Sequence, residues 1–217
     1  MKKNLKEILD SWPKNFIQDT DLAILLGKTD DSRYSVVKRA LASGVLIRLR
    51  KGLYLIASKT GVVLPDEFEL ALLVYGPSIV SLESALSYHN LIPEAVYTTT
   101  CVSPKRAQEF KTPIGVFSYK HVPQDGFYAG VKRVVTATST IFVADPWRAL
   151  ADFVYTRRRT WKNFAELEAD LRIDIDVLMS GDNELLKTLS ENYPSTRVRV
   201  VLKRFLKEII KKNKVLV

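Results

Sequence analysis

The sequence contains few of the residues from which catalytic and metal sites are usually built. One cysteine and two histidines occur among its 217 residues. A lone cysteine excludes an intramolecular disulfide, and Cys101 within an apolar stretch is typical of a small core residue. His89 and His121 lie in different segments, without a Cys or acidic partner at metal-ligand spacing. We therefore expect no catalytic residue, no metal site and no cofactor, and a reducing, cytoplasmic location.

Glycine and proline are also scarce, with nine residues of each, while 47% of the chain is hydrophobic. This composition argues against disorder and indicates a folded protein with a sizeable core. No run approaches the roughly eighteen apolar residues of a membrane span. Residues 1–12 are charged and lack the apolar stretch of a signal peptide. We expect neither export nor contact with a membrane.

Negative charge is in deficit, and the net charge of +9 suits a polyanionic partner. The excess is uneven, because residues 1–60 hold twelve Lys and Arg against six Asp and Glu. The later parts of the chain are closer to balance. The basic excess therefore points to the N-terminal segment as the region that meets a nucleic acid.

Residues 17–56 indicate, in order, a helix, a turn, a second helix, a strand, a tight turn and a strand. Suitable caps are Asp19 or Thr20 for the start of the first helix, Gly27 for its end, and Thr29 or Asp30 for the second. An earlier helix over residues 5–12 completes a three-helix core. This order of elements is that of a winged helix-turn-helix.

The second helix of the pair is predicted to be divided into two faces. Val37, Ala40, Leu41 and Gly44 share one side, whereas the other side carries short and basic residues, namely Ser32, Ser35, Lys38, Arg39 and Ala42. Short side chains let a helix enter the major groove, where Arg and Lys donate to guanine edges or phosphates.

The strands after this helix form the predicted wing. Val45, Ile47 and Leu49 alternate with Leu46, Arg48 and Arg50, and Gly52 supplies the positive φ that a tight turn needs. Arg50 and Lys51 then carry two cations toward a phosphate backbone. The alternative is a plain hairpin with solvated charges.

The remainder of the chain predicts a larger α+β domain. We place the N-terminal domain at residues 1–60 and the second at 61–217, with a linker near 58–65. Two helices, 67–75 and 82–89, precede an antiparallel sheet of three or more strands within 95–144. Ser81 is the expected N-cap of the second helix, and Asn90 its left-handed end. Further helices follow Asp145-Pro146 and lie near 163–171, 174–191 and 195–212.

Two basic clusters outside the N-terminal domain allow several interpretations. The C-terminal residues Arg197 to Lys214 carry many cations and one acid, Glu208. They form a solvated helix face, a second nucleic-acid contact or a surface for an acidic protein. Arg157-Arg158-Arg159 with the neighbouring Trp161 either binds phosphate and stacks on a base, or ends a helix, with Trp161 packing under the next helix.

Three segments together resemble the AbiEi-like antitoxins of type IV toxin–antitoxin, or abortive infection, systems. They are RKGLY at 50–54, SIVSLESALSYHNLIPE at 78–94 and DPWRALADFV at 145–154. Asn90 stands where glycine is expected in such proteins, and both residues tolerate positive φ. The resemblance spans most of the chain and rests on the order of the segments, since each alone is short.

The resemblance implies a protein with two roles. The N-terminal domain represses its own operon by binding inverted repeats in operator DNA, and the C-terminal domain counteracts a nucleotidyltransferase-like toxin, with direct contact left open. The implied DNA-binding residues are Ser32, Arg33, Ser35, Lys38 and Arg39 on the helix and Arg48, Arg50 and Lys51 on the wing. Arg33 lies nearest the packed side.

Two other functions compete with the antitoxin hypothesis. One is a transcriptional regulator whose second domain senses a ligand or mediates dimerisation. The other, more distant, is a nucleic-acid-processing enzyme with a targeting winged helix. The sequence contains no phosphate-binding glycine loop and no nucleophile elbow, so we expect the protein not to be an enzyme.

Overall fold

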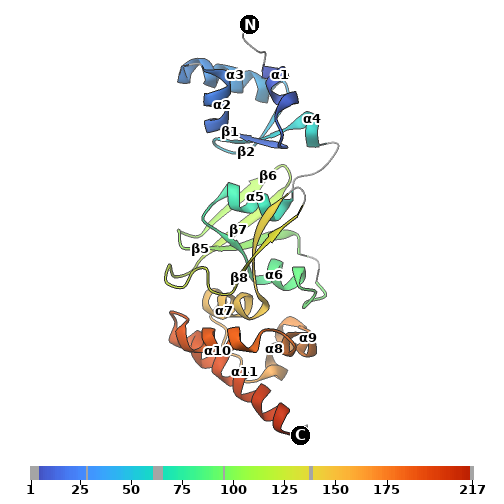
Figure 1. Ribbon diagram of the computed structural model, residues 1–217, viewed down its shortest axis with the longest axis vertical. Coiled ribbons are helices and arrows are strands. Elements are labelled where there is room, and N and C mark those ends of the chain that lie inside the picture. Colours follow the sequence, from blue (N-terminus) through green and yellow to red (C-terminus); the bar gives the residue numbers. More distant parts are fainter. Residues whose placement is uncertain (1–4, 28, 61–65, 95, 137–138, 216–217) are drawn as a thin grey trace.

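The computed structural model describes residues 5–27, 29–60, 66–94, 96–136 and 139–215. Its elements follow one another along the long axis of the molecule (Figure 1). A small sheet with helices forms the N-terminal end, a larger sheet the middle, and helices the C-terminal end. The fold is therefore α+β, as predicted.

The N-terminal end combines helices with a small antiparallel sheet of strand order β1-β3-β2. Its elements are α1 (Leu5–Ser11), β1 (Phe16–Gln18), α2 (Asp19–Leu26), α3 (Asp30–Ala42), β2 (Leu46–Arg50) and β3 (Leu53–Ile56). The helices and the hairpin were predicted. Strand β1 was not, because three residues are too few to show an alternating pattern.

Helix α2 begins one residue earlier than the predicted caps. Its N-cap is Gln18, whose N–H donates to Asp21 Oδ2 at 2.9 Å in a reciprocal capping box. The predicted N-caps Asp19 and Thr20 lie instead in the first turn. The predicted end is confirmed, since Gly27 takes φ +54° and its N–H donates to Ala23 O.

The small sheet buries side chains on both of its faces. Ile17, Leu46, Tyr54 and Ile56 pack against residues of the first three helices. On the other face, Phe16, Leu49, Leu53 and Leu55 belong to the large core that continues through the rest of the described chain. Every residue of β3 is consequently buried.

The middle of the chain forms a six-stranded sheet of order β6-β7-β5-β4-β9-β8. Its strands are β4 (Ile79–Val80), β5 (Thr98–Ser103), β6 (Gln108–Thr112), β7 (Gly115–His121), β8 (Val131–Val135) and β9 (Thr140–Ala144). Helices α4 (Ala57–Thr60), α5 (Glu67–Val74) and α6 (Leu82–Tyr88) precede or interrupt it. Part of the predicted linker is thus helical, while residues 61–65 lie outside the described residues.

The predicted antiparallel character of this sheet is wrong, because the sheet is mixed. Strand β7 lies parallel to β5, and β4 lies parallel to β9. After β5 the chain forms β6 at the outer edge of the sheet. Strand β7 then returns antiparallel to β6 and lies between β6 and β5, so it runs in the same direction as β5. Turn signals reveal where strands end, but not which strands become neighbours.

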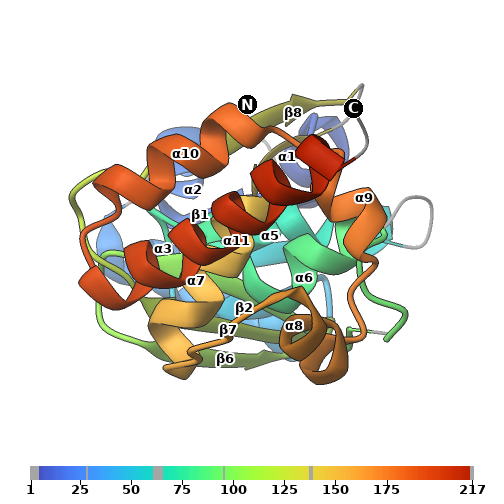
Figure 2. The ribbon, with the colours of Figure 1, turned by 90° about the horizontal axis from the view of Figure 1, so that it is seen from below.

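The C-terminal part is helical, and Figure 2 shows its helices from below. It comprises α7 (Pro146–Arg157), α8 (Phe164–Leu171), α9 (Ile175–Met179), α10 (Asn183–Asn192) and α11 (Thr196–Val215). The helix predicted over 174–191 is two helices. The break falls at Ser180–Asp182, where Asp182 accepts a hydrogen bond from Leu185 N at 2.9 Å and so begins α10.

A buried polar network joins α6, α7 and the end of α10. Asp152 is fully buried and accepts hydrogen bonds from Ser81 Oγ at 2.8 Å, Arg148 Nε at 2.9 Å and Tyr193 Oη at 2.9 Å. The Arg148 guanidinium also donates to the carbonyls of Gly126, Phe127 and Ala129. Burial, with the charge of Asp152 adding to it, raises the pKa of Tyr193 far above its ordinary value.

This network changes the predicted role of Ser81. Ser81 does occupy the N-cap position of α6, but its hydroxyl makes no capping bond and donates to Asp152 instead. At the other end of the helix, Asn90 has φ +56°, as predicted.

Candidate nucleic-acid interface

Helix α3 turns one side to the core and the other to solvent. Val36, Val37 and Ala40 are buried. The predicted outward residues Ser32, Ser35, Lys38, Arg39 and Ala42 are all exposed. The amphipathic division is therefore confirmed, although Gly44, assigned to the packed side, is exposed just beyond the helix end, with φ +71°.

The basic side chains of α3 differ in how free they are. Lys38 makes no hydrogen bond or ion pair within the described residues, and Arg39 Nε donates only to Ser35 O, at 3.3 Å. Arg33 is 19% exposed and forms an ion pair with Asp30 at 2.8 Å. Lys38 and Arg39 are thus available to a partner, whereas Arg33 is held beside the start of its own helix.

The turn between β2 and β3 is fixed to the start of α2. Gly52 has φ +79°, as predicted, and its carbonyl accepts a hydrogen bond from Asp19 N at 3.0 Å. A Cβ added at Gly52 would lie 3.3 Å from Asp19 Oδ2. Both the backbone angle and this close approach favour glycine here.

The three cations of the predicted wing have different surroundings. Arg48 and Lys51 are exposed. The Arg50 guanidinium instead donates to Leu73 O on α5 at 3.0 and 3.3 Å, and to Lys51 O at 2.8 Å. The structure therefore presents Arg48 and Lys51 to solvent and holds Arg50 against α5.

A shift in strand register explains why Arg48 and Arg50 separate. Strict alternation places them on one side, but the β2–β3 pairing shifts between these two residues. Such an irregularity redirects the side chains that follow it. Leu46 and Leu49 are consequently the buried residues of β2, three positions apart.

Tyr34 is an exposed residue of this surface that sequence reasoning missed. Its side chain on α3 is 66% exposed. It stands four residues before Lys38, and this spacing places both on the same side of a helix. The spacing was visible in the sequence and could have added Tyr34 to the predicted outward face.

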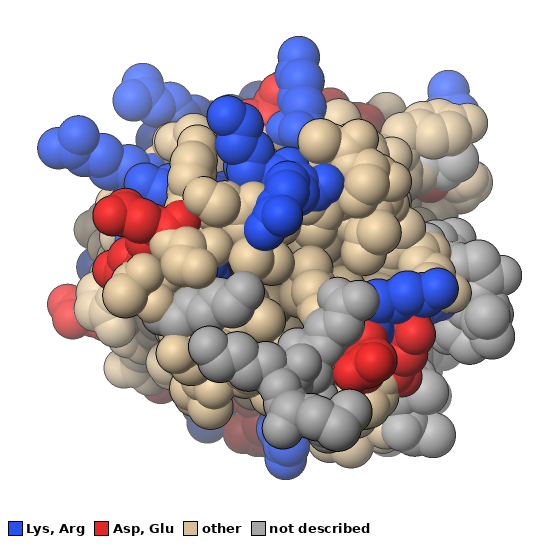
Figure 3. Space-filling view, turned by 90° about the horizontal axis from the view of Figure 1, so that it is seen from above, with Lys and Arg blue, Asp and Glu red and all other residues tan. Residues whose placement is uncertain are grey.

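Basic side chains gather at the N-terminal end of the molecule. Figure 3, which views the molecule from this end, shows Lys and Arg concentrated over one half of the face, with acidic side chains toward its margins. Exposed basic residues of this part are Lys6, Lys14, Lys38, Arg39, Arg48 and Lys51. Four of these residues, Lys38, Arg39, Arg48 and Lys51, lie on the helix and hairpin that were predicted to bind DNA.

The two histidines lie within hydrogen-bond distance of backbone carbonyls, and the cysteine is buried. A ring nitrogen of His89 lies 2.9 Å from Ala144 O, and one of His121 lies 3.1 Å from Lys105 O. Cys101 is buried, and this burial, with Glu67 adding to it, raises the pKa of its thiol. Among the described residues, no group of three or more His, Cys, Asp or Glu is arranged to hold a metal ion.

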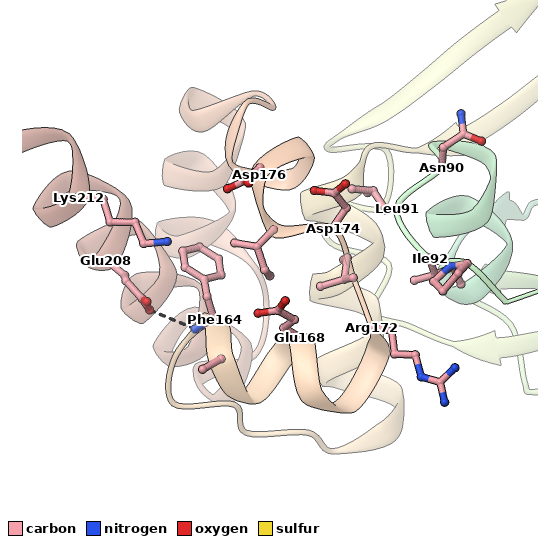
Figure 4. Close-up of a pocket in the computed structure, with 14 residues that line it drawn as sticks. Asn90, Leu91, Ile92, Phe164, Glu168, Arg172, Asp174, Asp176, Glu208 and Lys212 are labelled. Carbon is pink, nitrogen blue, oxygen red and sulfur yellow. Dashed lines mark hydrogen bonds between the residues drawn. The ribbon is translucent and has the colours of Figure 1, made fainter. Parts of the chain in front are cut away.

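An open cavity of about 790 Å³ lies between the segment after α6 and helices α8, α9 and α11. Figure 4 shows carboxylates from several of these elements around it. Glu208 accepts a hydrogen bond from Phe164 N at 3.1 Å, and Asp174 caps α9 through Val177 N at 3.0 Å. Two of the carboxylates that line the cavity therefore have structural partners.

The arginine triplet matches the structural interpretation of that segment. Arg158 takes the left-handed position at the end of α7, and Arg157 pairs with Glu83 at 2.8 Å. Trp161 is buried, and its Nε1 donates to Asp170 at 2.9 Å. The predicted packing of Trp161 is confirmed.

Some basic residues of α11 have hydrogen-bond partners and others do not. Arg197 and Arg199 donate to the carbonyls of Tyr155 and Tyr193. Lys203, Lys207 and Lys211 are exposed and have no hydrogen-bond or ion-pair partner among the described residues. The side chain of Lys214 lies outside the described residues.

Comparison with known proteins assigns no family: no protein-family model matches the chain, and no curated protein is significantly similar to it. Among the described residues, no helix has both the length and the apolar composition required to cross a bilayer.

Proposed function

We propose that this protein binds double-stranded operator DNA through an N-terminal winged helix-turn-helix. The observation that carries the proposal is the exposed face of α3, where Ser32, Ser35, Lys38 and Arg39 lie together with the free Tyr34 side chain. Small and basic side chains on one face suit insertion into the major groove, about 12 Å wide. In this arrangement α3 reads bases and α2 supports it.

The hairpin supplies the wing in this proposal. Strand β2 contacts α3, and the exposed Arg48 and Lys51 extend the basic surface beyond the helix. Such cations contact phosphates and fix the orientation of the protein on the duplex without reading sequence. Arg50, bound to Leu73 O, holds the hairpin in place rather than contacting DNA.

We further propose that the protein is the antitoxin of a type IV toxin–antitoxin system and represses its own operon. This part rests on the resemblance of three segments. Two of them contribute Ser81, Arg148 and Asp152 to the same buried network. The shared residues therefore support a common fold of the second part and do not themselves form a surface for the toxin.

Binding to the DNA upstream of the gene tests the first proposal. We expect Arg39→Ala to weaken binding by about 1 to 3 kcal/mol and to relax the preference at one base position, because a base contact is lost. Lys187→Ala is the matched control, since Lys187 is exposed on α10 at the opposite end of the molecule. Fluorescence anisotropy over a library of substituted operators measures both effects. Unchanged affinity and preference in Arg39→Ala would contradict the assignment of α3.

Growth of cells that express the neighbouring gene tests the antitoxin proposal. We expect the full chain to rescue growth, and the Arg39→Ala variant to rescue equally while failing to repress a promoter reporter. A harmless neighbour, or continued toxicity with the protein demonstrably expressed, excludes the antitoxin role. The proposal of operator binding is unaffected by that result, and the protein is then a transcriptional regulator. A groove in the second part of the molecule favours this second candidate function.

A further inference from the structure

A groove of about 600 Å³ lies on one face of the six-stranded sheet. Its base is the row formed by Thr100 on β5, Ser118 on β7 and Glu109 on β6, which are neighbours in the sheet register. The other face of these strands is different, because Cys101, Phe117 and Tyr119 are buried in the core there. Helices α6 and α7 form the wall of the groove.

Several polar groups lining this groove lack a partner in the described part of the chain. Glu83 Oε1 pairs with Arg157, but its Oε2 is buried without a hydrogen bond. Ser118 is mostly buried and its hydroxyl makes no hydrogen bond, and neither Lys120 nor Glu109 forms an ion pair. A buried acceptor without a donor is unfavourable, and a bound donor removes this penalty.

Most of the other residues that line the groove are apolar, or are acids that already have an ion-pair partner. Leu86, Ile92 and Phe153 contribute apolar surface, and Tyr97, 91% exposed, stands at the rim. Glu94 and Asp170 are paired with Arg172 and Arg159, respectively. The groups left over are therefore one cation, Lys120, and the acceptors of Glu83 and Glu109, beside an apolar wall.

We propose that this groove binds a small zwitterion of the α-amino-acid class with an apolar side chain. Lys120 receives the carboxylate, the oxygens of Glu83 and Glu109 receive the ammonium group, and the Ser118 hydroxyl donates to the carboxylate or accepts from the ammonium group. The apolar side chain lies against Leu86 and Phe153. Few polar groups converging on an apolar wall are typical of small-molecule sites.

Calorimetric titration of the full-length protein with L-phenylalanine and L-leucine tests this assignment. Two analogues of phenylalanine each lack one of its charged groups: 3-phenylpropionate lacks the ammonium group, and phenethylamine lacks the carboxylate. We expect an amino acid to bind, and each analogue to bind at least roughly tenfold more weakly, because each leaves one charged partner unsatisfied. If neither amino acid binds at millimolar concentration, the proposal is overturned.

Substitutions of residues that line the groove test whether the amino acid binds there. Lys120→Met and Ser118→Ala should each weaken binding of the amino acid, the first by roughly tenfold or more. Lys111→Met is the control, since Lys111 is exposed on the neighbouring strand β6 and does not line the groove. Equal affinity in the Lys120→Met protein, with its thermal midpoint unchanged, overturns the site. Tight binding of 3-phenylpropionate overturns the zwitterionic class. Neither outcome affects the proposal of DNA binding, which involves other residues.

Discussion

At the scale of single residues, one buried carboxylate holds several elements together. Asp152 accepts hydrogen bonds from the start of α6, from its own helix α7 and from Tyr193 at the end of α10. Asp152 and Arg148 are 0% and 2% exposed. A buried ion pair of this kind determines which side chains contact each other. Its net contribution to the free energy of unfolding depends on how completely hydrogen bonds compensate the two buried charges.

We predict that Asp152→Ala lowers the free energy of unfolding by about 3 to 5 kcal/mol, because it leaves the Arg148 charge buried without its carboxylate. Chemical denaturation measures this loss. Tyr193→Phe removes a single hydrogen bond and should cost about 1 kcal/mol, which keeps the test usable if Asp152→Ala fails to fold. Glu191→Ala, at an exposed acid on α10, is the control and should change stability by less than about 0.5 kcal/mol. A small effect of Asp152→Ala would show that the three carbonyls around Arg148 suffice.

At the scale of elements, the β2–β3 hairpin is held at two points. Its turn is bound to α2 through Asp19 N and Gly52 O, and Arg50 binds the last turn of α5 through Leu73 O. Tyr119 Oη donates to Ala71 O on the same helix, at 2.7 Å. Two carbonyls in the last turn of α5, those of Ala71 and Leu73, thus accept hydrogen bonds from side chains of the two sheets, and the Arg50 bond holds the hairpin against α5.

This geometry separates the expected effects of two neighbouring cations. We predict that Lys51→Ala lowers the slope of log K against log salt by about 0.9, because one phosphate contact is lost. Arg50→Ala should leave this slope unchanged and lower the free energy of unfolding by about 1 to 3 kcal/mol. Anisotropy titrations at several salt concentrations, with denaturation of the same proteins, give both quantities. A reduced slope in Arg50→Ala would restore Arg50 to the predicted phosphate contacts.

At the scale of the whole molecule, the small sheet shares a core with the rest of the chain. Phe16, Leu49, Leu53 and Leu55 pack in the same cluster as residues of α5 and the large sheet. The boundary predicted at residue 60 remains a prediction. A chain cut there exposes this apolar face to water, and exposed apolar surface of this kind promotes association.

We predict that a fragment of residues 1–60 self-associates and unfolds at lower denaturant concentration than the full chain. The reason is the loss of the contacts that bury Leu53 and Leu55. Sedimentation velocity and denaturation of the fragment and of the full chain test this. A monomeric fragment as stable as the same segment in the whole protein would show that the two parts fold independently.

The local features of this protein were determined by the sequence itself. The end of α2 at Gly27, the exposed face of α3 and the left-handed Asn90 each depend on residues within about one helical turn. The candidate DNA-binding face could be predicted for the same reason, because helical spacing alone assigns its side chains.

Only the tertiary structure decided the features that join distant segments. The contact of Arg50 with Leu73 O, the parallel pairing of β5 with β7 and the convergence of Glu83, Ser118 and Lys120 in one groove have no local signal. Strand neighbours and inter-element hydrogen bonds are selected by burial of the whole core, to which residues far apart in the chain contribute together.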